Sequence, residues 1–194
     1  QSFFGYDPLA GVVDAPGQGL LLFAPAYAAD NFFVDVPLTT SLVTLDTGTF
    51  TAFERNRFGE DEEGVAVGET RQGFSAVGGG NLRFGPDNVV RDCVGSAVAN
   101  ALQDPSVVEI TANSLTGCDE GIVFVLDTIH PAAPVITQAT TAQVSGTCDT
   151  AGRIEIFSDL GNQGETYLGS RSCDGQTPWS LAVSVPSGRN VTAT

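Results

Sequence analysis

The chain has 194 residues and a formal net charge of −15, because 23 acidic residues face eight basic ones, all of them arginine. Nucleic-acid binding is excluded, because contacts with phosphates need clustered lysine and arginine side chains. The absence of lysine also excludes Schiff-base catalysis and a phosphate-binding P-loop. Hydrophobic residues make up 42% of the chain and charged ones 16%, which is enough apolar material for a folded core.

The sequence begins without methionine, which indicates a processed chain whose signal peptide was removed before Gln1. No stretch of about 18 or more apolar residues is present, so no insertion into a membrane is expected. Four cysteines, together with abundant glycine and threonine, favour a protein that is secreted or held at the cell surface.

Helical periodicity is nearly absent, and short β-branched or aromatic runs alternate with turn residues, which predicts an all-β fold. Residues 1–41 hold two apolar stretches outside any repeat and are interpreted as an arm or a cap. Residues 42–127 are predicted to form a stack of repeats, and residues 128–194 a second β domain. The boundary falls where Pro131 and Pro134 suggest an extended linker.

A repeat of 25 residues runs through the middle of the chain, where segment 88–98 aligns with segment 113–123. Each segment contains an asparagine, a cysteine and a short apolar strand. A period of this length with a recurring asparagine predicts a β-solenoid, in which every coil adds one strand to each parallel sheet. Asparagine side chains are expected to form a hydrogen-bonded ladder at the turns. The predicted ladder consists of Asn56, Asn81, Asn88 and Asn113.

Cys93 and Cys118 are 25 residues apart, and so are Cys148 and Cys173. Four cysteines allow three pairings, and the equal spacing favours pairing within each half of the chain. On adjacent coils, Cys93 and Cys118 would lie on strands about 4.8 Å apart, within reach of a disulfide. The alternative is a set of buried free thiols.

The asparagine, valine and cysteine pattern of residues 88–93 and the Gly-Ile-Val-Phe run at 121–124 resemble right-handed parallel β-helix repeats of exported bacterial proteins. That resemblance covers residues 42–126. Segments 144–148, 153–159, 164–169 and 190–194 resemble bacterial Ig-like domains, which often follow such β-helices. The resemblance implies a short right-handed parallel β-helix followed by an Ig-like β-sandwich. The family pattern continues past Thr194, so the implied sandwich lacks its usual last strand.

A sandwich without its last strand would leave an open edge that a strand of another molecule could fill. The N-terminal residues are the predicted donor, and head-to-tail addition of this kind gives an open filament. The alternative is that this segment caps the end of the β-helix. The donor candidates are Phe3, Phe4, Tyr6, Leu9, Val12, Val13, Phe32, Val34 and Val36.

Three features could support chemistry, and each has a simpler structural interpretation. Asp46 begins the Asp-Thr-Gly triplet of aspartic proteases, with an imperfect second copy at Asp127, but the triplet is also a common turn. His130 is the only histidine, so a zinc site or a catalytic triad would have to use it. An acidic loop could bind calcium, but a solvated loop is favoured, because no EF-hand or calcium-repeat spacing is present. That loop contains Glu60, Asp61, Glu62 and Glu63.

The sequence therefore predicts a structural protein that is not an enzyme, needs no cofactor and associates mainly with itself. The expected function is that of a subunit in an extracellular filament or surface assembly, joined by strand complementation. One alternative is an adhesin or carbohydrate-binding module of a larger surface protein, although Trp179 is expected in the core rather than against a sugar. The second alternative is a β-helix polysaccharide lyase or hydrolase, with Arg83, Arg91 and Asp92 on one coil face.

Overall fold

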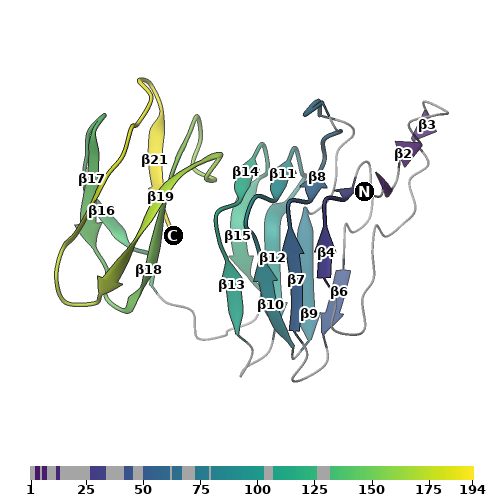
Figure 1. The fold of residues 1–194 in the computed structure, drawn as a ribbon, viewed down its shortest axis with the longest axis horizontal. Coiled ribbons are helices and arrows are strands. Elements are labelled where there is room, and N and C mark those ends of the chain that lie inside the picture. Colours follow the sequence, from purple (N-terminus) through teal and green to yellow (C-terminus); the bar gives the residue numbers. More distant parts are fainter. Residues whose placement is uncertain are drawn as a thin grey trace. The chain divides into compact units, whose positions relative to one another are not determined.

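The chain divides into two compact units, Gln1–Thr128 and Ile129–Thr194, and each is described by itself. In the computed structural model, every regular element of the described residues is a β-strand, which confirms the predicted all-β class (Figure 1). Within that part of the chain, no helix is long and apolar enough to cross a membrane. The structure describes residues 3–4, 6–7, 12–13, 27–33, 42–45, 50–61, 63–66, 73–78, 80–102, 107–125 and 132–194.

The first unit repeats a group of three strands, and each strand of a group belongs to a different sheet. Each such group is termed a coil. The first coil contains β4 (Tyr27–Ala29), β5 (Phe32–Phe33) and β6 (Leu42–Leu45). The second contains β7 (Phe50–Glu54), β8 (Arg57–Phe58) and β9 (Phe74–Gly78). The third contains β10 (Asn81–Phe84), β11 (Val89–Arg91) and β12 (Ser96–Leu102), and the fourth contains β13 (Val108–Ile110), β14 (Ser114–Thr116) and β15 (Glu120–Phe124).

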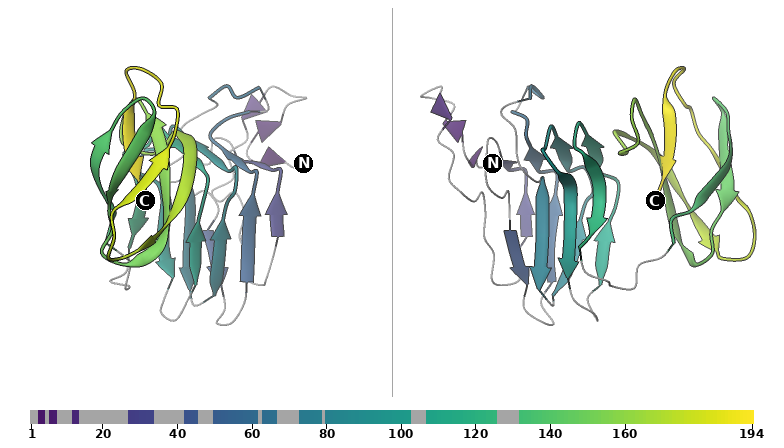
Figure 2. Two further views of the ribbon diagram at one scale, coloured as in Figure 1. Left: turned by 60° about the vertical axis from the view of Figure 1, so that its left-hand side comes forward. Right: turned by 180° about the vertical axis from the view of Figure 1, so that it is seen from behind.

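Corresponding strands of successive coils pair side by side in parallel, which gives three parallel sheets (Figure 2). Their orders are β4-β7-β10-β13, β5-β8-β11-β14 and β6-β9-β12-β15. β1 (Phe3–Phe4) extends the second of these sheets beside β5, and β2 (Tyr6–Asp7) pairs antiparallel with β3 (Val12–Val13). The parallel stack therefore includes residues 27–33, which the sequence assigned to the arm before residue 42.

Phenylalanine side chains fill the space between the three sheets. Phe33, Phe53, Phe58, Phe74 and Phe84 are each 0% exposed. The rings of Phe33 and Phe58 stack with centroids 4.6 Å apart, and those of Phe74 and Phe84 with centroids 4.5 Å apart. Burying one such ring contributes roughly 1.5–3 kcal/mol. Because the rings of one coil pack on those of the next, each coil depends on its neighbours for stability.

The second unit contains two three-stranded antiparallel sheets that share one core. Its core includes Val144, Ile154, Ile156 and Trp179, and Trp179 is 3% exposed, as expected for a core residue. One sheet has the order β16-β17-β20, and the other has the order β19-β18-β21. The strands are β16 (Val135–Ala139), β17 (Gln143–Thr147), β18 (Ala151–Asp159), β19 (Thr166–Asp174), β20 (Trp179–Ala182) and β21 (Asn190–Ala193).

Candidate functional site

A row of asparagine side chains follows the corner between the first and second strands of each coil. It consists of Asn31, Asn56, Asn88 and Asn113. At each step, the backbone N–H and the Nδ2 of one asparagine donate to the Oδ1 of the next, at 2.9–3.2 Å. The last three members are buried, so the row satisfies backbone groups that water does not reach.

Asn81 is not part of this row, although the sequence placed it there. It lies in β10, and its Oδ1 accepts a hydrogen bond from the Val107 N–H at 2.8 Å. Asn31, which the sequence prediction omitted, occupies the start of the row, 25 residues before Asn56. The step from Asn56 to Asn88 spans 32 residues, because the second coil is longer than its neighbours. A constant period of 25 residues, counted from Asn56, leads to Asn81, and this is why the sequence prediction included it.

The residue before each asparagine of the row has a left-handed backbone. The φ angles are 59° at Asp30, 54° at Arg55, 63° at Asp87 and 49° at Ala112. This conformation turns the chain from one sheet into the next, and it costs a residue with a side chain about 1–2 kcal/mol. The hydrogen bonds of the following asparagine offset that cost, so each left-handed corner depends on the asparagine of the row that follows it.

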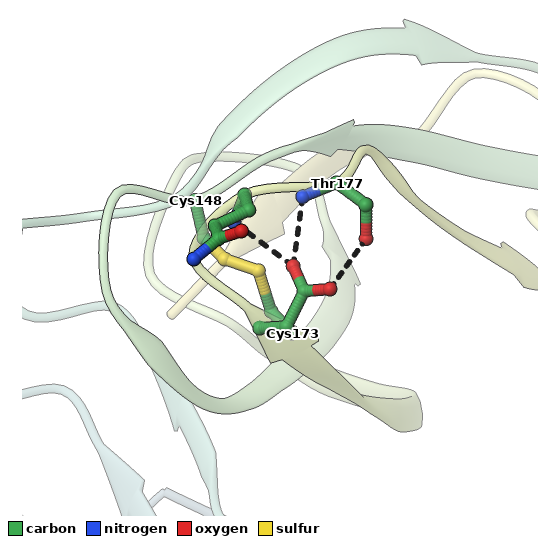
Figure 3. The surroundings of a disulfide bond; sticks show 5 residues. Cys148, Cys173 and Thr177 are labelled. Carbon is green, nitrogen blue, oxygen red and sulfur yellow. Dashed lines mark hydrogen bonds between the residues drawn. A yellow bond between two sulfur atoms is a disulfide. The ribbon is translucent and has the colours of Figure 1, made fainter.

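Both predicted disulfides are present. Cys93–Cys118 joins the third and fourth coils, with Cα atoms 4.5 Å apart. Cys148–Cys173 lies in the second unit, close to Thr177, whose N–H and Oγ1 donate to the carboxylate of Asp174 at 2.7 and 2.8 Å (Figure 3). Two disulfides indicate an oxidising compartment.

The fourth coil ends the stack with three outermost strands. Among the described residues, β13, β14 and β15 each have a neighbour strand on one side only. The N–H of Glu120 donates to Gly95 O in the third coil. Along a strand, successive N–H groups point alternately to the two sides, so the N–H groups of Gly121 and Val123 point toward the open side. Val107 and Val125 beside these strands are 58% and 59% exposed. An edge with exposed valines beside it and outward backbone donors is a template for adding another strand.

The predicted donor residues that the structure describes lie in strands paired within the chain. Phe3 and Phe4 form β1, which pairs in parallel with Phe32 and Phe33 of β5. In this chain, β1 therefore extends the second sheet beside the first coil. The β2–β3 hairpin contains Tyr6, Val12 and Val13. The remaining candidates, Leu9, Val34 and Val36, lie outside the described residues.

A cluster of polar side chains from the first three coils lies on the outer surface of the stack. The Oε2 of Glu54 accepts a hydrogen bond from the Tyr27 hydroxyl at 2.9 Å, and Arg83 donates to its Oε1. Arg55 binds both carboxylate oxygens of Asp30 at 2.8 and 2.9 Å. The Tyr27 hydroxyl, and after it Arg83, lowers the pKa of Glu54, and the hydrogen bond from Arg55 lowers the pKa of Asp30. Both carboxylates are thus ionised and engaged at neutral pH. These residues come from three coils, so sequence spacing could not reveal the cluster.

The acidic loop is tied to the coil surface rather than arranged around an ion. Glu60 is 4% exposed, and its carboxylate binds Arg57 and Arg91. The carboxylate of Asp61 accepts two backbone N–H groups of its own turn, at 3.1 and 2.8 Å. Glu62 lies outside the described residues, and the described ones contain no group that could hold a metal ion. The geometry gives the calcium interpretation no support.

The residues that the sequence suggested for catalysis do not form a described site. Asp46, Asp127 and His130 lie outside the part of the chain that the structure describes. Arg83 is bound to Glu54, and Arg91 is bound to Glu60 and to the Gly64 carbonyl. The two arginines are thus engaged in ion pairs that fix the coil surface.

A comparison with known protein families finds no match, and a comparison with curated proteins also finds none. The function of this chain therefore has to be inferred from its own geometry.

Proposed function

We propose that this chain is a secreted structural subunit of an extracellular filament or surface assembly, in which subunits join by adding strands to one another. In this proposal the four coils are a right-handed parallel β-helix, and the second unit is an Ig-like β-sandwich. The three parallel sheets of the first unit and the two antiparallel sheets of the second support that assignment. The two disulfides and the absence of lysine suit a durable protein outside the cell.

The observation that supports the proposal most directly is the outer edge of the fourth coil. Proteins commonly protect such an edge with lysine, proline or a covering segment. Among the described residues, this coil exposes Val107 and Val125 beside its outer strands, and Glu109 and Glu120 are the charged side chains on β13 and β15. The second unit offers further outer strands, namely β16, β19, β20 and β21, and one of these would be the acceptor if the sandwich takes a neighbour's strand.

A second candidate is a carbohydrate-binding module of a surface protein. The observation that favours it is Tyr27, which is 61% exposed and lies between charged groups that could bind sugar hydroxyls. A Tyr27→Ala variant should then lose binding to a glycan array, while a matched Tyr167→Ala variant, in the second unit, should keep it.

The assembly proposal is tested with the whole oxidised chain. Light scattering and electron microscopy are used to follow its mass and shape as protein concentration rises at physiological salt. Polymers that resist SDS without heating are expected, because strand addition closes many backbone hydrogen bonds at once. A chain that stays monomeric across the whole concentration range would contradict the proposal.

A further inference from the structure

We propose that the fourth coil of one copy is the docking surface for the first coil of a second copy, so that the three parallel sheets and the asparagine row continue from copy to copy. This inference rests on the proposed self-association and names its interface. It places the main joint in the first unit rather than in the second.

The order of the outer strands at the two ends of the stack supports this joint. At one end the outermost strands are β13, β14 and β15, and at the other end β4 and β6 are the outermost strands of the corresponding sheets. Continuing each sheet would pair β13 with β4, β14 with β5 and β15 with β6 of the next copy. All three pairs would be parallel, like the pairs inside the stack. The contact is heterologous, so it leads to an open filament rather than a closed dimer.

The asparagine row gives the joint a direction. Within the row, the N–H and Nδ2 of each asparagine donate to the Oδ1 of the next one. Among the described contacts, the Oδ1 of Asn31 receives no donor, and the N–H of Asn113 donates to no acceptor. Placing the Asn31 of a second copy after the Asn113 of the first satisfies both groups at once. If two copies met through their fourth coils instead, the unused N–H donors of the two Asn113 residues would face each other. Neither donor would then find an acceptor.

The inward side chains also match across the proposed joint. Phe33, Phe58, Val90 and Leu115 form one column, because they occupy paired positions on β5, β8, β11 and β14. A second copy would place its Phe33 over Leu115 and extend the column. At present β1 pairs with the same edge of β5 through Phe3 and Phe4, so it has to leave before a copy can add there. Only two residue pairs are exchanged, and the three new strand pairs replace them.

A pair of introduced cysteines tests the register. Tyr27, Ala52, Arg83 and Glu109 occupy paired positions on β4, β7, β10 and β13, so Tyr27 and Glu109 of one chain are three strand spacings apart. That separation is about 14 Å, too far for a disulfide within the chain. Across the joint, Glu109 of one copy and Tyr27 of the next would be direct neighbours. Cys93–Cys118 shows that paired positions on successive coils can be bridged.

The Tyr27→Cys/Glu109→Cys variant should therefore give a ladder of disulfide-linked multimers on a non-reducing gel, and reduction should collapse it to one band. The control is Tyr27→Cys/Val94→Cys, because Val94 is 57% exposed but lies in a turn of the third coil. Equal ladders from both variants would overturn the register. A wild-type chain that polymerises, with no ladder from the first variant, would overturn the joint and leave the proposed function standing. A wild-type chain that never polymerises would contradict both the joint and the proposed function.

A second set of variants guards against misfolding of the cysteine pairs. Val107→Lys, in the fourth coil, should abolish assembly, whereas Val94→Lys and Val135→Lys should not, because all three valines are 57–58% exposed and only Val107 borders the joint. Each variant reduces the negative charge equally, so repulsion between copies cannot explain a difference. Loss of assembly in Val135→Lys alone would place the joint in the second unit and overturn the inference.

Discussion

Asn88 shows how one side chain can hold two corners of the fold. Its Oδ1 accepts from the N–H and Nδ2 of Asn56, and its Nδ2 donates to Phe53 O and to Asn113 Oδ1. The residue is 0% exposed, so water cannot replace these bonds. An Asn88→Ala variant should lower the free energy of unfolding by about 3–4 kcal/mol, because buried donors and acceptors lose their partners.

Chemical denaturation monitored by fluorescence measures this loss. Asn81→Ala is the matched control, because the Asn81 side chain accepts one hydrogen bond, from Val107 N–H, outside the row. That change should cost about 1 kcal/mol. Equal losses in the two variants would show that the row contributes no more than an ordinary polar contact.

The hydrogen bonds of Asp174 should make the stability of the second unit depend on pH in the acid range. Its carboxylate accepts hydrogen bonds from the N–H groups of Thr177 and Gln176 and from the Thr177 hydroxyl, and these lower its pKa from 3.8 to about 2. A depressed pKa stabilises the folded state above the pKa of the unfolded chain, and the contribution is lost as the pH falls through the folded value. The turn at residues 174–177 should therefore weaken between pH 4 and pH 2.

The wild-type chain and an Asp174→Asn variant should be compared by denaturation across that range. The stability difference should stay constant above about pH 5 and shrink as the pH falls below the unfolded pKa near 4. Direct titration of the Asp174 carboxyl by NMR gives the same information. A difference that does not change with pH would contradict the assignment.

At the scale of elements, the Cys93–Cys118 disulfide holds the fourth coil to the third. The coil has neighbour strands on one side only, so it is the part of the described stack most prone to open. Closing a loop of 25 residues stabilises a protein by about 3.5 kcal/mol in the chain-entropy account. In a Cys93→Ala/Cys118→Ala variant, amide exchange should speed up in residues 107–125 before it changes in the second and third coils.

Hydrogen exchange read by mass spectrometry resolves this pattern. The Cys148→Ala/Cys173→Ala variant is the control, because it leaves the first unit intact and should loosen the second unit alone. Uniformly faster exchange throughout the first unit would show that the disulfide supports the whole stack and not its last coil.

At the scale of the whole molecule, charge opposes self-association. Each copy has a formal net charge of −15, and the fourth coil contributes Glu109 and Glu120 near the proposed joint. Raising the ionic strength from about 0.01 M to 0.15 M shortens the screening length from about 30 Å to about 8 Å. Assembly should therefore begin at a lower protein concentration at the higher salt.

Light scattering gives the concentration at which assembly begins. The Glu109→Gln variant should make that concentration depend less on salt. Glu63→Gln changes an exposed residue of the acidic loop and should have a smaller effect. Assembly that weakens as salt is added would show that opposite charges, rather than apolar edges and backbone hydrogen bonds, hold the copies together.

Sequence patterns that act over a few residues predicted much of this protein. Alternating apolar runs and turn residues indicated strands, and the equal spacing of the cysteines indicated both disulfides. The spacing of Cys93 and Cys118 is the length of one coil, whereas the second unit has no coils and its equal spacing has no such structural cause. Asn88 and Asn113 were found for the same reason. Trp179 was placed in a core because a large apolar ring gains most from burial.

The long-range contacts were decided by the tertiary structure. The second coil contains an outer loop between β8 and β9, and such a loop lengthens a coil at little cost in free energy, so the period changes there without disturbing the sheets. This is why Asn88, 32 residues on, and not Asn81 follows Asn56 in the row. Contacts between coils, such as those of Glu60 with Arg91 and of Glu54 with Tyr27 and Arg83, depend on how the coils stack and have no fixed spacing in the sequence. The sequence by itself determined which segments become strands and which cysteines can pair. Only the tertiary structure decided which strands end each sheet, because that depends on how many residues every coil uses before it returns.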